Sequence, residues 1–284
     1  MSLAIKILFN SIKSIHPTHG DVSVGKYKIE PIPSKTLEGR NHLYRYVLHF
    51  GDNLREGEFS TNPEQEARLL ISLLSVMFGT CLEIESAMYN SVQIEIGMER
   101  IYKETTIVMD DLPPLSDALT HISQMDIDIA RQYLRAAETY RIGIGFMGKN
   151  PTLSFFLLSI SIECLANKTI KGDGMCDCFV EFILKYITDR TPYQTDEEWK
   201  TVLKEIYYNH RSGYTHGGKP IPDAVFLADQ LGRNYVKNEI DGKEVKTPGL
   251  KWFARVVRDV LVNFLLTQSG NKEISIDQMK ELSL

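Results

Sequence analysis

The sequence predicts an α+β protein, with a small α+β domain over residues 1–111 followed by a helical bundle over residues 112–284. Three observations lead to this prediction. Short runs of alternating apolar and polar residues occur before residue 112, a single amphipathic helix interrupts them, and nearly every later segment has a helical apolar period. A chain of 284 residues is long enough for two ordinary domains.

The first part of the chain is expected to contain three strands and one helix. Alternation predicts strands over residues 26–32, 43–50 and 91–97. Between them, Asn62 can cap a helix, Pro63 suits its first turn and Gly79 ends it. Its apolar stripe would pack on the sheet, and consists of Leu69, Leu70, Leu73, Leu74 and Met77. Because this part has no glycine-rich phosphate loop, metal spacing or nucleophile motif, its role is not indicated.

The second part is predicted to be helical almost throughout. Apolar stripes predict helices over residues 129–144, 151–165, 178–187, 195–206, 222–231 and 252–265. Thr195 and Glu198 form the pattern of a capping box at the start of the fourth helix. The short linkers favour antiparallel neighbours in a bundle. Residues 237–249, rich in charge and glycine, are expected to form a long loop.

Composition excludes several classes of protein. A hydrophobic fraction of 43% and a charged fraction of 24% are typical of soluble globular proteins. The net charge of −5 argues against a protein that coats nucleic acid through bulk charge. Residues 204–259, however, contain ten basic and seven acidic residues, so this segment is locally positive in an acidic chain.

Export, membrane insertion and metal binding are not expected. The longest nearly apolar run, residues 153–162, is too short to span a bilayer and ends at Glu163, and the N-terminus lacks the features of a signal peptide. The four cysteines do not form a disulfide-rich pattern; they are Cys81, Cys164, Cys176 and Cys178. The pair at 176 and 178 lacks a second ligand pair at finger-like spacing. We therefore expect a cytoplasmic protein with reduced thiols, no metal and no cofactor.

Residues 205–219 hold most of the functional information. Arg211 and His216 are separated by four residues, and Gly217-Gly218 follow. Guanidinium offers forked donors to phosphate oxygens, and histidine can move a proton near neutral pH. Arg211 borders the apolar stripe of its helix, so it can face a cleft between helices, and replacing it in an open cleft should alter the melting temperature little.

The relative direction of the two side chains depends on the helix end. On an unbroken α-helix, His216 would point roughly 140° away from Arg211. Gly213 and Gly217-Gly218 predict that the helix loosens beyond about Thr215, which could bring the imidazole round toward the guanidinium. Alternatively, the two groups could meet across a two-fold dimer axis.

The motif Arg-Ser-x-Tyr-x-His-Gly-Gly at residues 211–218, preceded by an aromatic helix end, resembles the signature of the HEPN superfamily in its Apea-like branch. The resemblance extends to residues 159–165, where such domains place a glutamate before a leucine, here Glu163, and covers roughly residues 126–268. It implies an all-helical HEPN-like bundle and a metal-independent endoribonuclease assembled at a homodimer interface. In such enzymes the RNA 2′-hydroxyl attacks the adjacent phosphate, giving a cyclic phosphate and a free 5′-hydroxyl.

The resemblance assigns roles to residues of this chain. Arg211 would stabilise charge on the phosphorane, and His216 would act as general acid or base or as a second phosphate donor. Two positions depart from the family pattern: Ser212 stands where catalytic members often carry Asn, Asp or His, and Gly218 where some related toxins carry tyrosine.

The supporting residues have alternative interpretations. Glu163 is the only acid in the apolar run 151–166 and could be a structural partner for a buried group, or could orient Arg211 in the site. Ser212 and Tyr214 are expected to support the site. The candidate RNA contacts are Lys204, Tyr208 and Lys219. The tyrosines at 207, 208 and 214 could stack on unpaired bases, or could be core or dimer-interface residues.

Three classes of function follow. The first is an RNA-cleaving hydrolase, such as a toxin or defence effector, in which the N-terminal domain senses a trigger. The second is a non-catalytic module that binds RNA or a nucleotide. The third is a dimeric interaction scaffold in which Arg211 and His216 only hold the bundle together. The sequence indicates neither the RNA substrate nor the regulatory partner.

Overall fold

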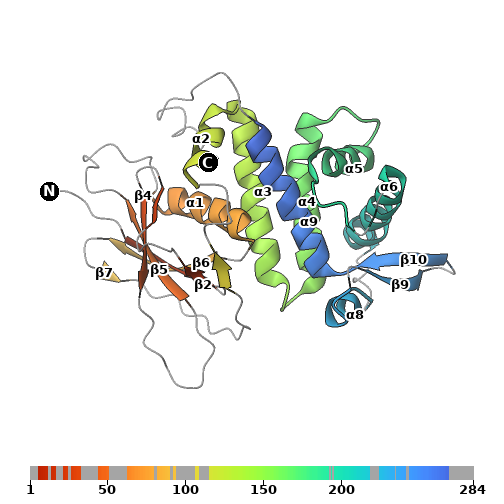
Figure 1. Cartoon of the computed structure of the whole chain (residues 1–284), viewed down its shortest axis with the longest axis horizontal. Coiled ribbons are helices and arrows are strands. Elements are labelled where there is room, and N and C mark those ends of the chain that lie inside the picture. The colour runs from red at the N-terminus through yellow and green to blue at the C-terminus, as the bar shows by residue number, and fades with distance from the viewer. Residues whose placement is uncertain are drawn as a thin grey trace. The chain divides into compact units, whose positions relative to one another are not determined.

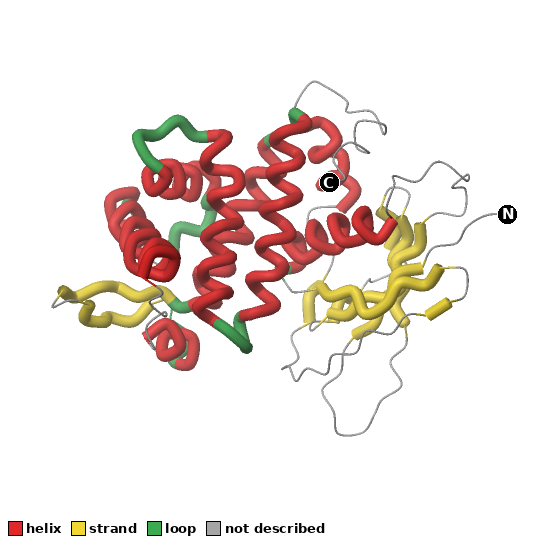
Figure 2. Tube along the Cα trace, turned by 180° about the vertical axis from the view of Figure 1, so that it is seen from behind, coloured by secondary structure: helices red, strands yellow, loops and turns green. Residues whose placement is uncertain are grey.

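The structure is a computed structural model of the chain, drawn in Figures 1 and 2. It describes residues 6–11, 14–16, 22–24, 27–32, 44–50, 63–79, 82–89, 92–93, 106–108, 115–191, 193, 195–217, 224–233, 235–240 and 243–268. The chain divides into two compact units, one of residues 1–130 with 268–284 and one of residues 131–267. The predicted boundary near residue 112 falls outside the described residues.

Strands of the first unit form a six-stranded sheet in the order β3-β4-β5-β1-β6-β7 and a separate two-stranded one, β2-β8. The first six are β1 (Lys6–Ser11), β2 (Ser14–His16), β3 (Val22–Val24), β4 (Tyr27–Ile32), β5 (Tyr44–Phe50) and β6 (Leu82–Tyr89). The other two are β7 (Val92–Gln93) and β8 (Thr106–Val108). Strands β4 and β5 coincide with two predicted strands; of the third, residues 92–93 form β7 and residues 94–97 lie outside the described part.

Helix α1 (Pro63–Phe78) lies where the sequence predicts it. Gly79 ends it with φ of 61°, a left-handed conformation that suits glycine. Four residues of the predicted stripe are buried, and they are Leu70, Leu73, Leu74 and Met77. The hydroxyl of Ser75 accepts a hydrogen bond from the backbone N–H of Leu82 at 3.1 Å, which ties α1 to the first residue of β6. Helix α2 (Leu115–Gln124) completes the described helices of this unit.

The second unit is mostly helical, as predicted. Its longest helices are α3 (Ile127–Phe146, which begins in the first unit), α4 (Pro151–Thr169) and α9 (Leu250–Thr267). Shorter elements are α5 (Met175–Tyr186), α6 (Asp196–Glu205), the π-helical segment η2 (Ile206–Ser212), α7 (Gly213–Gly217) and α8 (Ala224–Gln230). Figures 1 and 2 show α3, α4 and α9 side by side, with α5 and α6 following on the α4 side. Each predicted helix has an observed counterpart.

The core of this unit is rich in aromatic side chains. Its fully buried aromatic side chains are Tyr133, Tyr140, Phe155, Phe179, Phe182, Trp199, Phe253 and Phe264. The rings of Phe155 on α4 and Phe253 on α9 stack with centroids 4.4 Å apart. Helices α3 and α4 approach closely at Gly143, whose carbonyl accepts a hydrogen bond from the Ser154 hydroxyl at 2.7 Å. This packing fixes α4, and therefore the position of Glu163.

The prediction of a long loop in this unit is wrong. Residues 237–249 are not a long loop: β9 (Tyr235–Ile240) and β10 (Lys243–Pro248) pair as an antiparallel hairpin with Ile240 opposite Lys243. The Tyr235 ring stacks on Tyr193 with centroids 5.8 Å apart, so the hairpin is anchored to the aromatic core. The Asp241-Gly242 dipeptide between the strands is a strong hairpin signal, and it predicts this turn despite the charged composition of the segment.

Candidate functional site

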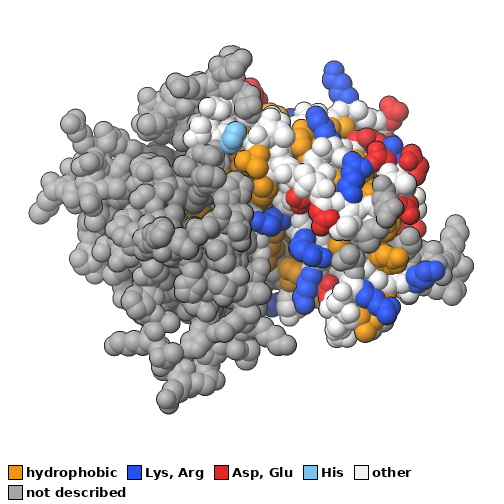
Figure 3. Space-filling model, in the orientation of Figure 1, with side chains coloured by type: hydrophobic (Ala, Val, Ile, Leu, Met, Phe, Trp, Pro, Cys, Tyr) orange, Lys and Arg blue, Asp and Glu red, His pale blue; other side chains and the backbone are white. Residues whose placement is uncertain are grey.

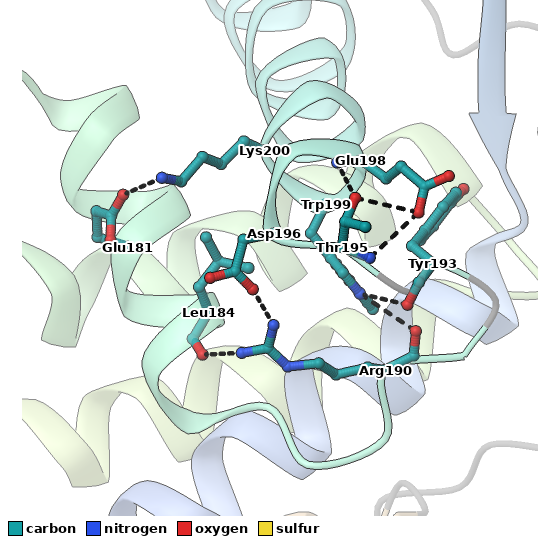
Figure 4. A network of polar contacts seen from close by, with 9 residues as sticks. All are labelled: Glu181, Leu184, Arg190, Tyr193, Thr195, Asp196, Glu198, Trp199 and Lys200. Atoms are coloured by element: carbon teal, nitrogen blue, oxygen red, sulfur yellow. Dashed lines mark hydrogen bonds and ion pairs between the residues drawn. The ribbon is translucent and has the colours of Figure 1, made fainter.

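The helix that carries the motif is firmly anchored at its start. The Thr195 hydroxyl accepts from the backbone N–H of Glu198, and the Glu198 carboxylate accepts from the backbone N–H of Thr195, both at 3.2 Å (Figure 4). This is the predicted capping box. One turn on, the fully buried indole of Trp199 donates to the carbonyl of Tyr193 at 3.2 Å. Helix α6 therefore leads into the motif from a fixed N-terminus.

From Ile206 to Ser212 the helix widens into the π-helical segment η2. Such segments are rare and are found frequently at functional sites. Arg211 lies near the end of this segment. The wider turn changes the direction in which each side chain leaves the helix, so an α-helical wheel does not place Arg211 correctly.

Arg211 is bound by Glu163 through two hydrogen bonds. The Nε of Arg211 donates to one carboxylate oxygen of Glu163 at 2.6 Å, and Nη2 donates to the other at 2.7 Å. The two side chains are 13% and 6% exposed, respectively. The pairing of Glu163 with Arg211, which both interpretations of the sequence allow, is thus observed. Most of the Arg211 side chain is buried against α4, so the small effect on the melting temperature that an open cleft would predict is not expected.

Aromatic packing holds the guanidinium from a further side. The Cζ of Arg211 lies 5.3 Å from the centroid of the Tyr207 ring, within the range of a cation–π contact. Tyr207 is itself buried and packs on Phe179 of α5 with centroids 5.4 Å apart. Desolvation alone would lower the pKa of Arg211, but the hydrogen bonds and charge of Glu163 outweigh it, so the pKa of Arg211 is raised. The guanidinium is a fixed, permanent cation.

One edge of this cation remains available. Nε and Nη2 face Glu163. Nη1 makes no hydrogen bond within the described residues, and it is not fully buried. Nη1 and the second N–H of Nη2 form the remaining fork of the guanidinium. A fork of this geometry matches two oxygens of a phosphate. The site can therefore hold an oxyanion against Arg211 while Glu163 keeps the arginine in place.

His216 is not part of this hydrogen-bonded pair. The helix stays regular as far as Gly217, two residues past the predicted point of loosening, and residues 218–223 lie outside the described part of the chain. His216 is exposed, and in the part of the chain that the structure describes its side chain makes no hydrogen bond to Arg211 or to another residue. The Thr215 hydroxyl donates to the carbonyl of Arg211 at 2.9 Å, which reinforces the helical path between them.

The supporting residues differ in accessibility. Tyr214 packs on Phe156 of α4 with centroids 5.3 Å apart, and Ser212 is half-buried at the end of η2. Tyr208 is 59% exposed. Lys204 is exposed and lies 3.4 Å from the carboxylate of Asp177. Lys219 and Gly218 lie outside the described residues.

Charge near the site is mixed. Figure 3 shows acidic side chains gathered over α5 and α6, with Lys and Arg side chains spread more widely over the helical part. Two ion pairs join these helices, Lys204 with Asp177 and Lys200 with Glu181 at 3.5 Å. Exposed pairs of this kind contribute little to stability.

Other chemistries lack support in the described residues. No group of three or more His, Cys, Asp or Glu residues in that part of the chain could hold a metal ion. Burial raises the pKa of both the Cys164 and the Cys176 thiol, so neither is an activated nucleophile. None of the helices in the described ranges combines the length and apolar character needed to cross a bilayer.

Sequence reasoning missed Tyr207 as the platform beneath Arg211. Tyr207 and Arg211 are four positions apart in the sequence, but their contact depends on the π-helical turn. Comparison of the chain with family models, curated proteins and solved structures gives no match. The geometry of the site and the resemblance of its motif are therefore the two indications of function.

Proposed function

We propose that this chain is a metal-independent endoribonuclease of the HEPN type that acts as a homodimer. In this proposal residues 112–284 form the HEPN-like bundle, and residues 1–111 form a small α+β domain that senses a trigger in a cytoplasmic defence or stress system. The observation that carries the proposal is the guanidinium of Arg211, held by Glu163 on one edge and open on the other.

The reaction would be a transesterification within RNA. The 2′-oxygen attacks the adjacent phosphorus, the bond from phosphorus to the 5′-oxygen breaks, and the products are a cyclic phosphate and a 5′-hydroxyl. The free fork of Arg211 would bind the phosphate oxygens as negative charge accumulates on them, which is usually the largest contribution to catalysis. His216 would take the proton from the 2′-hydroxyl or give one to the leaving 5′-oxygen.

The lack of a hydrogen bond between the two residues favours a site shared between subunits. Within one chain, the exposed imidazole of His216 is not bonded to Arg211. A two-fold dimer in which Arg211 faces the partner subunit's His216 would unite the two groups. This arrangement also gives a role to an exposed histidine whose side chain makes no hydrogen bond within the described residues.

A second candidate is a non-catalytic module that binds RNA or a nucleotide at the same arginine. The observation that favours it is that Arg211 is paired with Glu163 but not with His216, so a binding group exists without an adjacent proton donor in the same chain. A dimeric scaffold, in which the pair serves only packing, is the third.

A cleavage assay with complementation separates these candidates. The purified full-length chain is incubated with 5′-labelled mixed RNA, with and without EDTA. We expect cleavage in both, with cyclic-phosphate and 5′-hydroxyl ends. His216→Ala should lower the rate roughly 10²–10⁴-fold if the imidazole transfers a proton. Arg211→Lys, which keeps the charge opposite Glu163 but loses the fork, should lower it roughly 10²–10³-fold.

Mixing the two inactive variants tests the shared site. A mixed dimer contains one site with both an intact Arg211 and an intact His216, so mixing should restore cleavage. Cleavage that is absent under all conditions while RNA still binds would support the non-catalytic module instead. Protein that neither binds nor cleaves RNA but loses its dimer on substitution would support the scaffold.

A further inference from the structure

Three tyrosines surround the motif, and the structure distinguishes them. Tyr207 is only 6% exposed, with its ring between Arg211 and Phe179. Tyr214 packs its ring on Phe156. Tyr208, by contrast, is 59% exposed. No other large apolar or aromatic side chain in the described residues is more exposed. Only Tyr208 therefore offers much ring surface to a ligand.

The exposed ring is held in place. It lies nearly perpendicular to the Tyr207 ring, at an interplanar angle of 86° with centroids 5.7 Å apart. Its hydroxyl lies beside the Cys176 thiol at the start of α5, and hydrogen bonding to that thiol raises the pKa of Tyr208. A ring supported by a neighbouring ring and at its hydroxyl loses little conformational entropy when a ligand stacks on it.

Tyr208 and Arg211 share a neighbour. The Tyr207 ring lies 5.7 Å from the Tyr208 ring and 5.3 Å from the Arg211 guanidinium. The exposed ring and the open fork of the arginine are therefore both within reach of one nucleotide and its neighbour. Lys204, one helical turn before Tyr208, adds a cation on this stretch of helix, next to Asp177.

We infer that Tyr208 is a base-stacking platform that selects single-stranded RNA, placing an unpaired base on its ring while the neighbouring phosphate lies at Arg211. This inference rests on the proposed function and deepens it. Unpaired bases expose their π faces, whereas a duplex keeps them stacked inside, so an aromatic ring can discriminate between the two. Stacking is tolerant of sequence, because every base has such a face.

The test measures affinity by fluorescence anisotropy on the full-length chain. The probes are a short labelled single strand of mixed-sequence RNA and the same strand in a perfect duplex. Tyr208→Ala should weaken single-strand binding roughly 5- to 150-fold and leave duplex binding unchanged. Tyr208→Trp should retain the affinity, because it keeps a stacking ring. Leu231→Ala, which truncates another side chain that is 52% exposed, is the matched control and should change neither affinity.

The outcomes separate this inference from the proposed function. RNA binding by Tyr208→Ala equal to wild type overturns the platform and leaves the nuclease proposal standing. Single-strand binding that depends on Tyr208 without any cleavage supports the platform and overturns the nuclease. If Tyr208→Ala weakens binding of single strand and duplex equally, the platform is overturned. If Tyr208→Ala loses the dimer while its RNA affinity is unchanged, Tyr208 is a subunit contact, and the platform is again overturned. Melting curves should show that Tyr208→Ala and Tyr208→Trp both fold, since the Tyr208 side chain is exposed.

Discussion

Two arginine–carboxylate pairs in the helical unit make opposite use of the same chemistry. Arg190, in the connection between α5 and α6, pairs with Asp196, and these side chains are 38% and 52% exposed (Figure 4). Arg211 pairs with Glu163, and these side chains are 13% and 6% exposed. Arg190 also donates to the carbonyl of Leu184 at the end of α5, at 3.2 Å. The exposed pair thus holds the α5–α6 connection in place, whereas the buried pair joins α4 to the π-helical segment η2.

The difference bears on why the buried pair is present. Burying two charges costs several kcal/mol per ion by general estimates, and apolar residues of similar volume often serve stability as well or better. Apolar residues at both positions 163 and 211 could have packed here without either charge. A buried pair that leaves one fork of the arginine open is therefore better explained by orientation of Arg211 than by stability.

The two pairs should differ most in the stability that is lost when one partner of each pair is removed. Glu163→Ala should lower the free energy of unfolding by about 3–5 kcal/mol, because it leaves the Arg211 charge mostly buried without its partner. Asp196→Ala should lower it by about 1 kcal/mol or less, because water screens the exposed pair. Urea denaturation followed by circular dichroism measures both.

A double replacement sharpens this result. Glu163→Met combined with Arg211→Met removes both charges and should recover most of the stability lost by Glu163→Ala, while RNA binding is not recovered. Equal losses for Glu163→Ala and Asp196→Ala would contradict the distinction between a buried and an exposed pair. A double variant less stable than Glu163→Ala would make the pair a structural requirement.

A smaller effect is expected at the helix cap in the exposed region. Thr195→Ala should lower the free energy of unfolding by about 1 kcal/mol, because it leaves the backbone N–H of Glu198 without its acceptor. Thr201→Ala on the same helix is the control: its hydroxyl only donates to the carbonyl of Glu197, which the helix already uses. That change should be neutral or slightly stabilising, since alanine favours the helix. Similar losses for both would show that the cap is not the cause.

The same contrast explains what the sequence could reveal. The Thr195 cap and the apolar stripes were predictable because they depend on neighbours three or four residues away. The hairpin at residues 235–248 was also predictable from Asp241-Gly242, although the charged composition of the segment favours a loop. The burial of Arg211 was not predictable in the same way. It depends on a partner 48 positions earlier in the chain and on a π-helical turn, both of which are set by tertiary packing.

The smallest effects should appear in the pH dependence of stability, with opposite signs at two aspartates. Hydrogen bonds from the Thr191 hydroxyl and backbone lower the pKa of the exposed Asp189. Its stabilising contribution is therefore present above the ordinary aspartate pKa of about 4 and is lost as the pH falls through the lower folded-state value. Burial raises the pKa of Asp229, although the backbone N–H of Lys251 donates to it. Its contribution is therefore most favourable at low pH and declines as the pH rises from the ordinary pKa through the raised one.

Unfolding free energies of wild type, Asp189→Asn and Asp229→Asn, measured from about pH 3 to pH 7, test both signs. The advantage of wild type over Asp189→Asn should shrink toward acid. The advantage of wild type over Asp229→Asn should shrink, or reverse, toward neutral pH. Each variant is the control for the other, because a general effect of pH on the fold would move both differences in the same direction. Parallel slopes would therefore contradict the assignment. Opposite slopes would show that even in this unit the sign of a carboxylate's contribution follows its burial and its donors, the same two quantities that distinguish Glu163 from Asp196.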